Sequence, residues 1–238
     1  MSRYLEVIYG RTEYDENDYP QQLCDYLLNK IGSRLDLSKK GKLLDIACGR
    51  GNHLIAFQRR GFEVTGVDRT PEAADSLPDL NIVTSDADKN ELPFEDESFD
   101  VVFSKSLIEH IHNVEHFVSE CRRVLKPDGV IIFLTPDWCS HYRFFFDDYQ
   151  HVTPWTRKSL QNVLKIFDFE SVESELFRQL PFFWKCPQLE WVCDIIKLLP
   201  DTWRFKDKDE MVSNKLIRFS KEKMIVASAK KPQRNKLK

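Results

Sequence analysis

The chain has 238 residues, of which 42% are hydrophobic and 31% are charged, and its formal net charge is -3. This length suits one α/β domain with an appendage, and the composition is ordinary for a soluble protein. A slightly acidic chain has no general attraction to nucleic acid or anionic membranes, which disfavours both as partners. No apolar run reaches about 18 residues, the length of a membrane helix. Since the N-terminus also lacks a signal-peptide pattern, we expect a cytoplasmic protein.

The sequence pattern predicts no metal site and no disulfide framework. The six cysteines form no C-x-x-C pair and have no ligand spacing, so we expect them to be reduced. Asp137 is a lone acid without partners for a cation. The basic residues of 230–238 favour a solvated tail over an RNA-binding arm.

The first predicted elements precede a glycine-containing turn. Residues 18–37 carry apolar side chains at helical spacing, which predicts a helix packed against a sheet. Residues 4–14 are rich in aromatic side chains. They suit either a lid over a ligand site or a terminal segment docked on the surface.

The stretch 42–69 organises the rest of the chain. Residues 43–47 form an apolar run that predicts a strand buried on both faces, and 48–51 predict a turn. Gly49 and Gly51 reach positive φ at low cost. A glycine turn also lets backbone N–H groups approach a ligand closely, so we expect a ligand at this turn.

The pattern after the turn indicates a nucleotide-type ligand. Residues 52–60 have helical spacing and Gly61 follows as a C-cap, so the N-terminus of this helix points at the turn. Residues 63–67 predict a second strand that ends at Asp68. An acid near this spacing, at the tip of the second strand, accepts hydrogen bonds from ribose hydroxyls.

The remainder alternates strands with helices, which requires parallel pairing through right-handed crossovers. The predicted strands are 81–86, 98–104, 130–134, 169–177 and 222–229, and the predicted helices are 112–124 and 157–167. Ligands of such sheets bind outside the carboxyl ends of the strands. Residues 178–221 are too apolar for an exposed loop, so we expect helices that cap a substrate pocket or form a homodimer contact.

The turn motif resembles a known family. Its sequence is similar to the D-x-G-x-G-x-G motif of class I S-adenosylmethionine-dependent methyltransferases. The matching residues are Asp45-x-Ala47-Cys48-Gly49-x-Gly51. It differs from the G-x-G-x-x-G of dinucleotide sites and from a P-loop. Ala47 replaces the first glycine, a mild departure unless φ is positive there. Segments similar to the family's later motifs follow in order at 86–94, 98–104 and 125–130.

The resemblance implies a fold class and a domain organisation. The fold is α/β, with a Rossmann-like, seven-stranded, mostly parallel sheet, helices on both faces, an antiparallel last strand and a helical cap insertion. The implied parts are a lid and helix at 1–41, a core at 42–177 and 222–230, a cap at 178–221 and a basic tail at 231–238.

The resemblance also implies S-adenosylmethionine as the cofactor. The residues that it implicates in cofactor binding are Asp45, Ala47, Cys48, Gly49, Gly51, Asp68, Arg69, Asp86, Ala87 and Ser104. The turn backbone would meet the methionine part, and Asp68 would meet the ribose hydroxyls. Asp86 would accept from the adenine amino group, with the Ala87 N–H on the ring. Asp45 would orient the turn, and Ser104 would line the wall beneath the sulfonium.

The methyl acceptor is less directly indicated. The sequence of residues 104–107 is not the Asn/Asp-Pro-Pro-aromatic tetrad of amino-methylating enzymes. The chain also contains no Pro-Cys pair for attack on a pyrimidine ring. An oxygen nucleophile with a general base is then the simplest expectation, with His151 as the first candidate and His110 as the second. Either histidine could instead be a packing residue. We expect three further residues to be exposed on a helix, namely Glu109, His112 and His116.

We therefore expect a methyltransferase for a small polar acceptor, such as a hydroxyl of a sugar or a related metabolite. A small-amine N-methyltransferase, an RNA or protein methyltransferase, and a non-catalytic cofactor-binding partner subunit are the alternatives. An open pocket favours an enzyme. A pocket plugged by Trp155 or by the aromatic residues of 181–184 favours the binding subunit.

Overall fold

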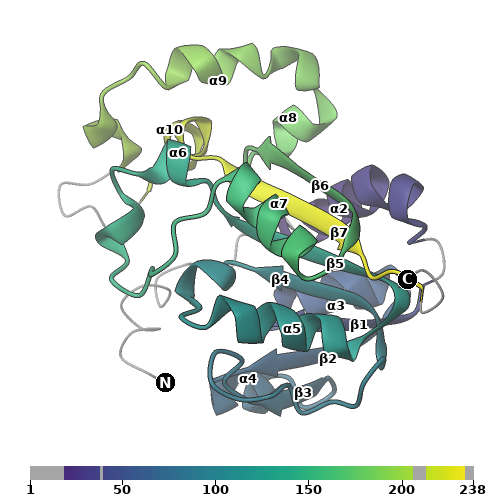
Figure 1. The fold of residues 1–238 in the computed structure, drawn as a ribbon. Coiled ribbons are helices and arrows are strands. Elements are labelled where there is room, and N and C mark those ends of the chain that lie inside the picture. The colour runs from purple at the N-terminus through teal and green to yellow at the C-terminus, as the bar shows by residue number, and fades with distance from the viewer. Residues whose placement is uncertain (1–18, 38–39, 206–212, 234–238) are drawn as a thin grey trace.

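A computed structural model describes residues 19–37, 40–205 and 213–233 (Figure 1). The predicted lid segment 4–14 lies outside these residues. In the part of the chain that is described, one seven-stranded sheet has the order β3-β2-β1-β4-β5-β7-β6. The strands are β1 Lys42–Ile46, β2 Glu63–Asp68, β3 Asn81–Thr84, β4 Phe99–Lys105, β5 Leu125–Pro136, β6 Glu170–Phe177 and β7 Met224–Lys230.

The sheet confirms the predicted fold class. Neighbouring strands from β3 to β5 are parallel, whereas β7 is antiparallel to both β5 and β6. The register pairs Ile46 of β1 with Val67 of β2 on one side and with Ser104 of β4 on the other. These three strands therefore end at the same edge, and the loops that follow them meet there.

Helices cover both faces of the sheet, because residues of the inner strands alternate between two apolar clusters. The helices are α2 Tyr19–Leu35, α3 Asn52–Arg59, α4 Pro71–Ser76, α5 Val114–Val124, α6 Trp138–His141, α7 Arg157–Ile166, α8 Pro181–Lys185, α9 Trp191–Ile196 and α10 Lys215–Lys221. On β4, Val102 faces the cluster with α5 and α7, and Phe103 faces the cluster with α2 and α3. Figure 1 shows these pairs on opposite faces.

The segment between β6 and β7 is helical where it is described. It contains α8, α9 and α10 with two short 3-10 turns, η3 Pro187–Leu189 and η4 Asp201–Arg204. Figure 1 shows α8 and α9 beyond the end of the sheet, away from α5. A buried ion pair joins Arg204 to Glu222 and ties this segment to the start of β7.

The start of the predicted basic tail is not solvated. Lys231 is buried, and its ammonium donates to the carbonyl oxygens of Arg122 at 2.9 Å and Leu125 at 2.6 Å. These bonds pin the chain to the end of α5, which a count of charges could not reveal. Residues 234–238 lie outside the described part. In the portions of the chain that are described, no helix is long and apolar enough to cross a membrane.

The α5 face supplies a test of the core. Phe117 is fully buried and stacks on Phe133 at a centroid distance of 5.7 Å. Phe117→Ala should lower the free energy of unfolding by about 3–5 kcal/mol, because a large cavity remains. Urea titration measures the change, with Ile166→Ala as control since Ile166 is 74% exposed. A loss below about 1 kcal/mol for Phe117→Ala would contradict this packing.

Candidate functional site

A large cavity opens at the carboxyl edge of the sheet. It has a volume of about 1910 Å³ and is lined by the loops after β1 to β4, by Tyr149, Gln150 and Val152, and by parts of α8 and α10. Of the candidate cofactor-binding and catalytic residues, those in the wall are Ala47, Gly49, Asp68, Arg69, Asp86, Ala87 and His110. One small ligand typically occupies about 300–1,000 Å³, so this cavity has room for two.

The turn after β1 is held in a left-handed conformation. The φ angles of Ala47, Gly49 and Gly51 are 64°, 51° and 68°. The N–H of Ala47 donates to the Val67 carbonyl at 2.8 Å, which fixes this geometry. The expectation of a mild departure at Ala47 was therefore wrong, because its φ is positive and an L-residue there costs roughly 1–2 kcal/mol. At Gly51 a Cβ would also collide with the side chain of Leu77.

Asp68 connects the end of β2 to this turn. Its Oδ2 accepts from the Gly49 N–H at 2.8 Å, and its Oδ1 accepts from the N–H and hydroxyl of Thr70 at 2.9 and 2.8 Å. A carboxylate offers about four acceptor positions, so one remains on Oδ2. Since Asp68 lines the cavity, that position is available to a ligand hydroxyl.

The segment after β3 adds an acceptor and a donor to the same wall. Asp86 accepts from the Asp88 N–H at 3.1 Å and pairs with Lys89 at 3.1 Å. The N–H of Ala87 donates to none of the described residues, although Ala87 is 91% buried in the cavity wall. A donor in the cavity wall without a protein partner can donate to a ligand acceptor.

Three expected cofactor residues lie behind the wall. Asp45 is buried, and burial followed by the neighbouring Asp68 raises its pKa well above the usual value. Cys48 is buried too, and burial raises its thiol pKa, which makes it inert as a nucleophile. The Ser104 hydroxyl donates to the Ile46 carbonyl at 2.9 Å and joins β4 to β1. The expected place of Ser104 in the wall is therefore wrong.

Lys105, and not Ser104, is part of the cavity wall at the end of β4. Burial lowers the pKa of its ammonium group, and the nearby Glu109 and Asp45 carboxyl groups only partly oppose this shift. The next residue, Ser106, has a strained φ of 56°. Sequence reasoning missed Lys105. The available signal was a cation at the carboxyl end of an otherwise apolar inner strand.

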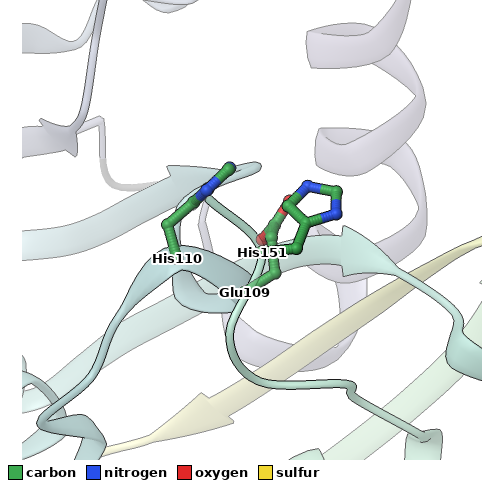
Figure 2. A group of neighbouring side chains, drawn as sticks. All are labelled: Glu109, His110 and His151. Carbon is green, nitrogen blue, oxygen red and sulfur yellow. The ribbon is translucent and has the colours of Figure 1, made fainter. Parts of the chain in front are cut away.

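The two candidate histidines lie together at the edge of the cavity. Their ring centroids are 4.7 Å apart, and Figure 2 shows the Glu109 carboxyl group between them. His110 belongs to η1 (Ile108–His110) and lines the cavity, whereas His151 packs behind it against Phe145 at 4.4 Å. The structure thus brings both residues together and gives His110 the direct access.

Backbone carbonyls fix both imidazole rings. Nδ1 of His110 lies 3.1 Å from the Gln150 oxygen, and Nδ1 of His151 lies 2.5 Å from the Phe145 oxygen. A carbonyl cannot donate, so each Nδ1 carries the proton and each Nε2 is left as an acceptor. Burial lowers the pKa of both rings, and this favours the neutral form that accepts a proton.

Glu109 is the residue whose position differs most from the expectation. It is 99% buried instead of exposed, because η1 turns its side chain under the cavity edge. Its Oε2 accepts from the Thr135 hydroxyl at 2.9 Å, and its Oε1 has no partner among the described residues. Burial raises its pKa to about 7. The useful signal was its position just beyond the end of β4.

The remaining candidates have structural roles. Asp137 caps α6 by accepting from the Ser140 N–H at 3.0 Å. The Trp155 indole is buried and donates to the Ile108 carbonyl at 3.1 Å. Trp184 stacks on Tyr26 at 4.8 Å, and Phe182 contributes to the wall. Trp155, Trp184 and Phe182 therefore leave the cavity of about 1910 Å³ open.

Comparison with known proteins identifies similar domains. Residues 44–133 match the family model described as a methyltransferase domain. A sterol 4-C-methyltransferase from Caenorhabditis elegans is 34% identical over 110 residues, which cover 43% of this chain and 33% of that protein. A ubiquinone biosynthesis O-methyltransferase from Actinobacillus pleuropneumoniae is 30% identical over 129 residues, half of each chain. The chain thus spans half or less of the length of these relatives.

Solved structures support the same fold over most of the chain. An S-adenosylmethionine-dependent methyltransferase from Archaeoglobus fulgidus superposes with a TM-score of 0.63 and is 22% identical. The superposition covers 89% of this chain and 94% of that one. At this level of identity, the likeness establishes the fold.

The conformation of Ala47 generates a stability prediction. Ala47→Gly should raise the free energy of unfolding by about 0.5–1 kcal/mol, because relief of roughly 1–2 kcal/mol of strain exceeds the backbone entropy of glycine. Urea titration measures the gain. Ala74→Gly, within α4, is the matched control and should lower stability by about 0.5–1 kcal/mol. An equal decrease in the free energy of unfolding of the two variants would contradict backbone strain at Ala47.

Proposed function

We propose, from the match of residues 44–133 to the methyltransferase domain family, that the protein transfers a methyl group from S-adenosylmethionine to a hydroxyl oxygen of a small polar acceptor. One observation carries the proposal. A single cavity of about 1910 Å³ has Asp68 and Asp86 in one part of its wall and His110 in another. The residues that we expect to bind the cofactor and the histidine that we propose as proton acceptor therefore line the same cavity.

The wall groups fit the cofactor. Asp68 retains one acceptor position for a ribose hydroxyl, and the unpaired Ala87 N–H suits a ring nitrogen of adenine. At Gly49 the space where a Cβ would stand is open, so the methionine part can approach the backbone. Asp86 offers its carboxylate to the adenine amino group.

When bound, S-adenosylmethionine supplies an electrophilic methyl carbon on its sulfonium. The chain must then align an acceptor oxygen with that carbon and exclude water. Leu180 and Phe182 supply an apolar part of the wall for this purpose. His110, with Nδ1 held by the Gln150 carbonyl, would receive the acceptor's proton at Nε2.

Several observations favour an oxygen acceptor over the alternatives. Neutral imidazoles beside a cavity suit removal of a hydroxyl proton. The O-methyltransferase relative is consistent with this chemistry, and the sterol relative shows that related domains also methylate carbon. An open cavity favours an enzyme over a non-catalytic partner subunit. A sugar or a related metabolite is the acceptor class that we propose.

The cofactor site is tested by calorimetric titration with S-adenosylmethionine. Asp68→Ala should weaken binding by about tenfold or more, because hydrogen bonds to charged groups contribute about 1.5–3 kcal/mol. Asp75→Ala, at an exposed position on α4, should bind as the wild type does. Equal affinities for the two variants would exclude Asp68 from the site. A wild type that binds no S-adenosylmethionine would overturn the proposed function.

The acceptor site is tested by release of S-adenosylhomocysteine over a panel of hydroxyl and amine acceptors. We expect turnover with a hydroxyl acceptor and a rate lower by about 10²–10⁴-fold in His110→Ala, since general bases contribute that much. S-adenosylmethionine affinity should stay within about twofold. His116→Ala is the control on α5. Turnover with amines alone would mean that the acceptor atom is nitrogen and not oxygen. A His110→Ala rate equal to that of the wild type would exclude His110 as the general base.

A further inference from the structure

We propose that Glu109, His110 and His151 form a binding site for a divalent transition-metal ion. One potential ligand atom from each residue lies within 4.8 Å of the other two. An ion at their centre would lie within about 2.8 Å of each atom, and shifts of about 0.5–1 Å reach the bond lengths of about 2.0–2.2 Å seen for zinc. Figure 2 shows that the three side chains converge.

The ligands have the supporting contacts that metal sites require. Metal-binding histidines usually donate their second ring nitrogen to a carbonyl or carboxylate, which fixes ring and tautomer. His110 does so to Gln150 and His151 does so to Phe145. The second carboxyl oxygen of Glu109 accepts from Thr135. Each residue thus has one oriented ligand atom to offer.

An independent observation indicates a cation. Oε1 of Glu109 is buried and has no hydrogen-bond partner among the described residues. Leaving such an atom unpaired costs about 1–3 kcal/mol, which a bound cation would offset. Asp148 Oδ2 lies 3.9 Å from His151 Nε2 and adds negative charge nearby. Lys105 is the opposing cation close to Glu109.

The donor set selects the class of ion. Two imidazole nitrogens and one carboxylate suit Zn²⁺, Fe²⁺ or Co²⁺, whereas Mg²⁺ and Ca²⁺ prefer oxygen ligands. Three protein ligands also leave coordination positions open. His110 lines the cavity, so an open position can face it.

The consequence for the reaction rests on the proposed function. In the ion-loaded protein Nε2 of His110 and Nε2 of His151 are ligands. His110 is then available as a base only in the metal-free protein. A hydroxyl that binds the ion would lose its proton to water more readily, because a bound cation lowers the pKa of its oxygen ligand. Metal binding itself is independent of turnover and is tested separately.

Titration of chelator-treated protein with Co²⁺, followed by visible absorption, tests the site. The protein carries Cys139→Ser, because Cys139 is an exposed thiol that would also bind Co²⁺. We expect one ion per chain at micromolar concentration or tighter. Glu109→Gln and His151→Gln should each weaken binding by about tenfold or more. His116→Gln, outside the cluster, should bind as the parent does, and circular dichroism verifies that each variant is folded.

Binding that is absent, or equal in the cluster variants and His116→Gln, would overturn the metal site. Binding of Mg²⁺ in preference to Co²⁺ would overturn the assigned class of ion. S-adenosylmethionine titrated into the same metal-free protein separates the two proposals. Retained cofactor binding without Co²⁺ binding would contradict only the metal site.

Discussion

The hydrogen bond from the Gly49 N–H to the Asp68 carboxylate is the constraint on which the cofactor end of the site depends. It joins the turn after β1 to the end of β2. These two segments are adjacent because Ile46 and Val67 are paired in the parallel register of β1 and β2. Gly49 makes this bond from a positive φ of 51°. Ala47 in the same turn has a strained φ of 64°, which fits the observation that strain concentrates at functional sites.

The acceptor end depends on a second long-range contact. The N–H groups of Val152 and Thr153 donate to the Glu109 carbonyl at 2.9 and 3.0 Å. These bonds hold the segment after β5 against η1 and bring His151 beside His110. In the same region the Glu109 carboxyl group is buried, and its Oε1 has no hydrogen-bond partner among the described residues. The proposed proton transfer and the proposed metal site both depend on this arrangement.

The two ends of the cavity are formed by different kinds of structure. The cofactor end consists of tight turns between inner strands, where backbone groups and single carboxylates have fixed positions. The acceptor end combines residues after β4 and β5 with α8 and α10. Such segments vary without disturbing the sheet, so one fold can serve different acceptors. The names of the two relatives, a sterol 4-C-methyltransferase and an O-methyltransferase, are consistent with such variation.

The sequence by itself determined the order of strands and helices, the glycine turn and the strand-end acids Asp68 and Asp86, because these depend on short-range periodicity and spacing. It could not determine the left-handed φ of Ala47, which the bond to Val67 imposes. Nor could it show that Ser104 turns away from the cavity and Lys105 toward it. Glu109 was expected to be exposed on a helix, but it is buried among residues distant in the sequence, since Thr135 donates to its carboxylate and Val152 and Thr153 donate to its carbonyl. Burial and side-chain convergence arise from such distant contacts, and local patterns do not contain them.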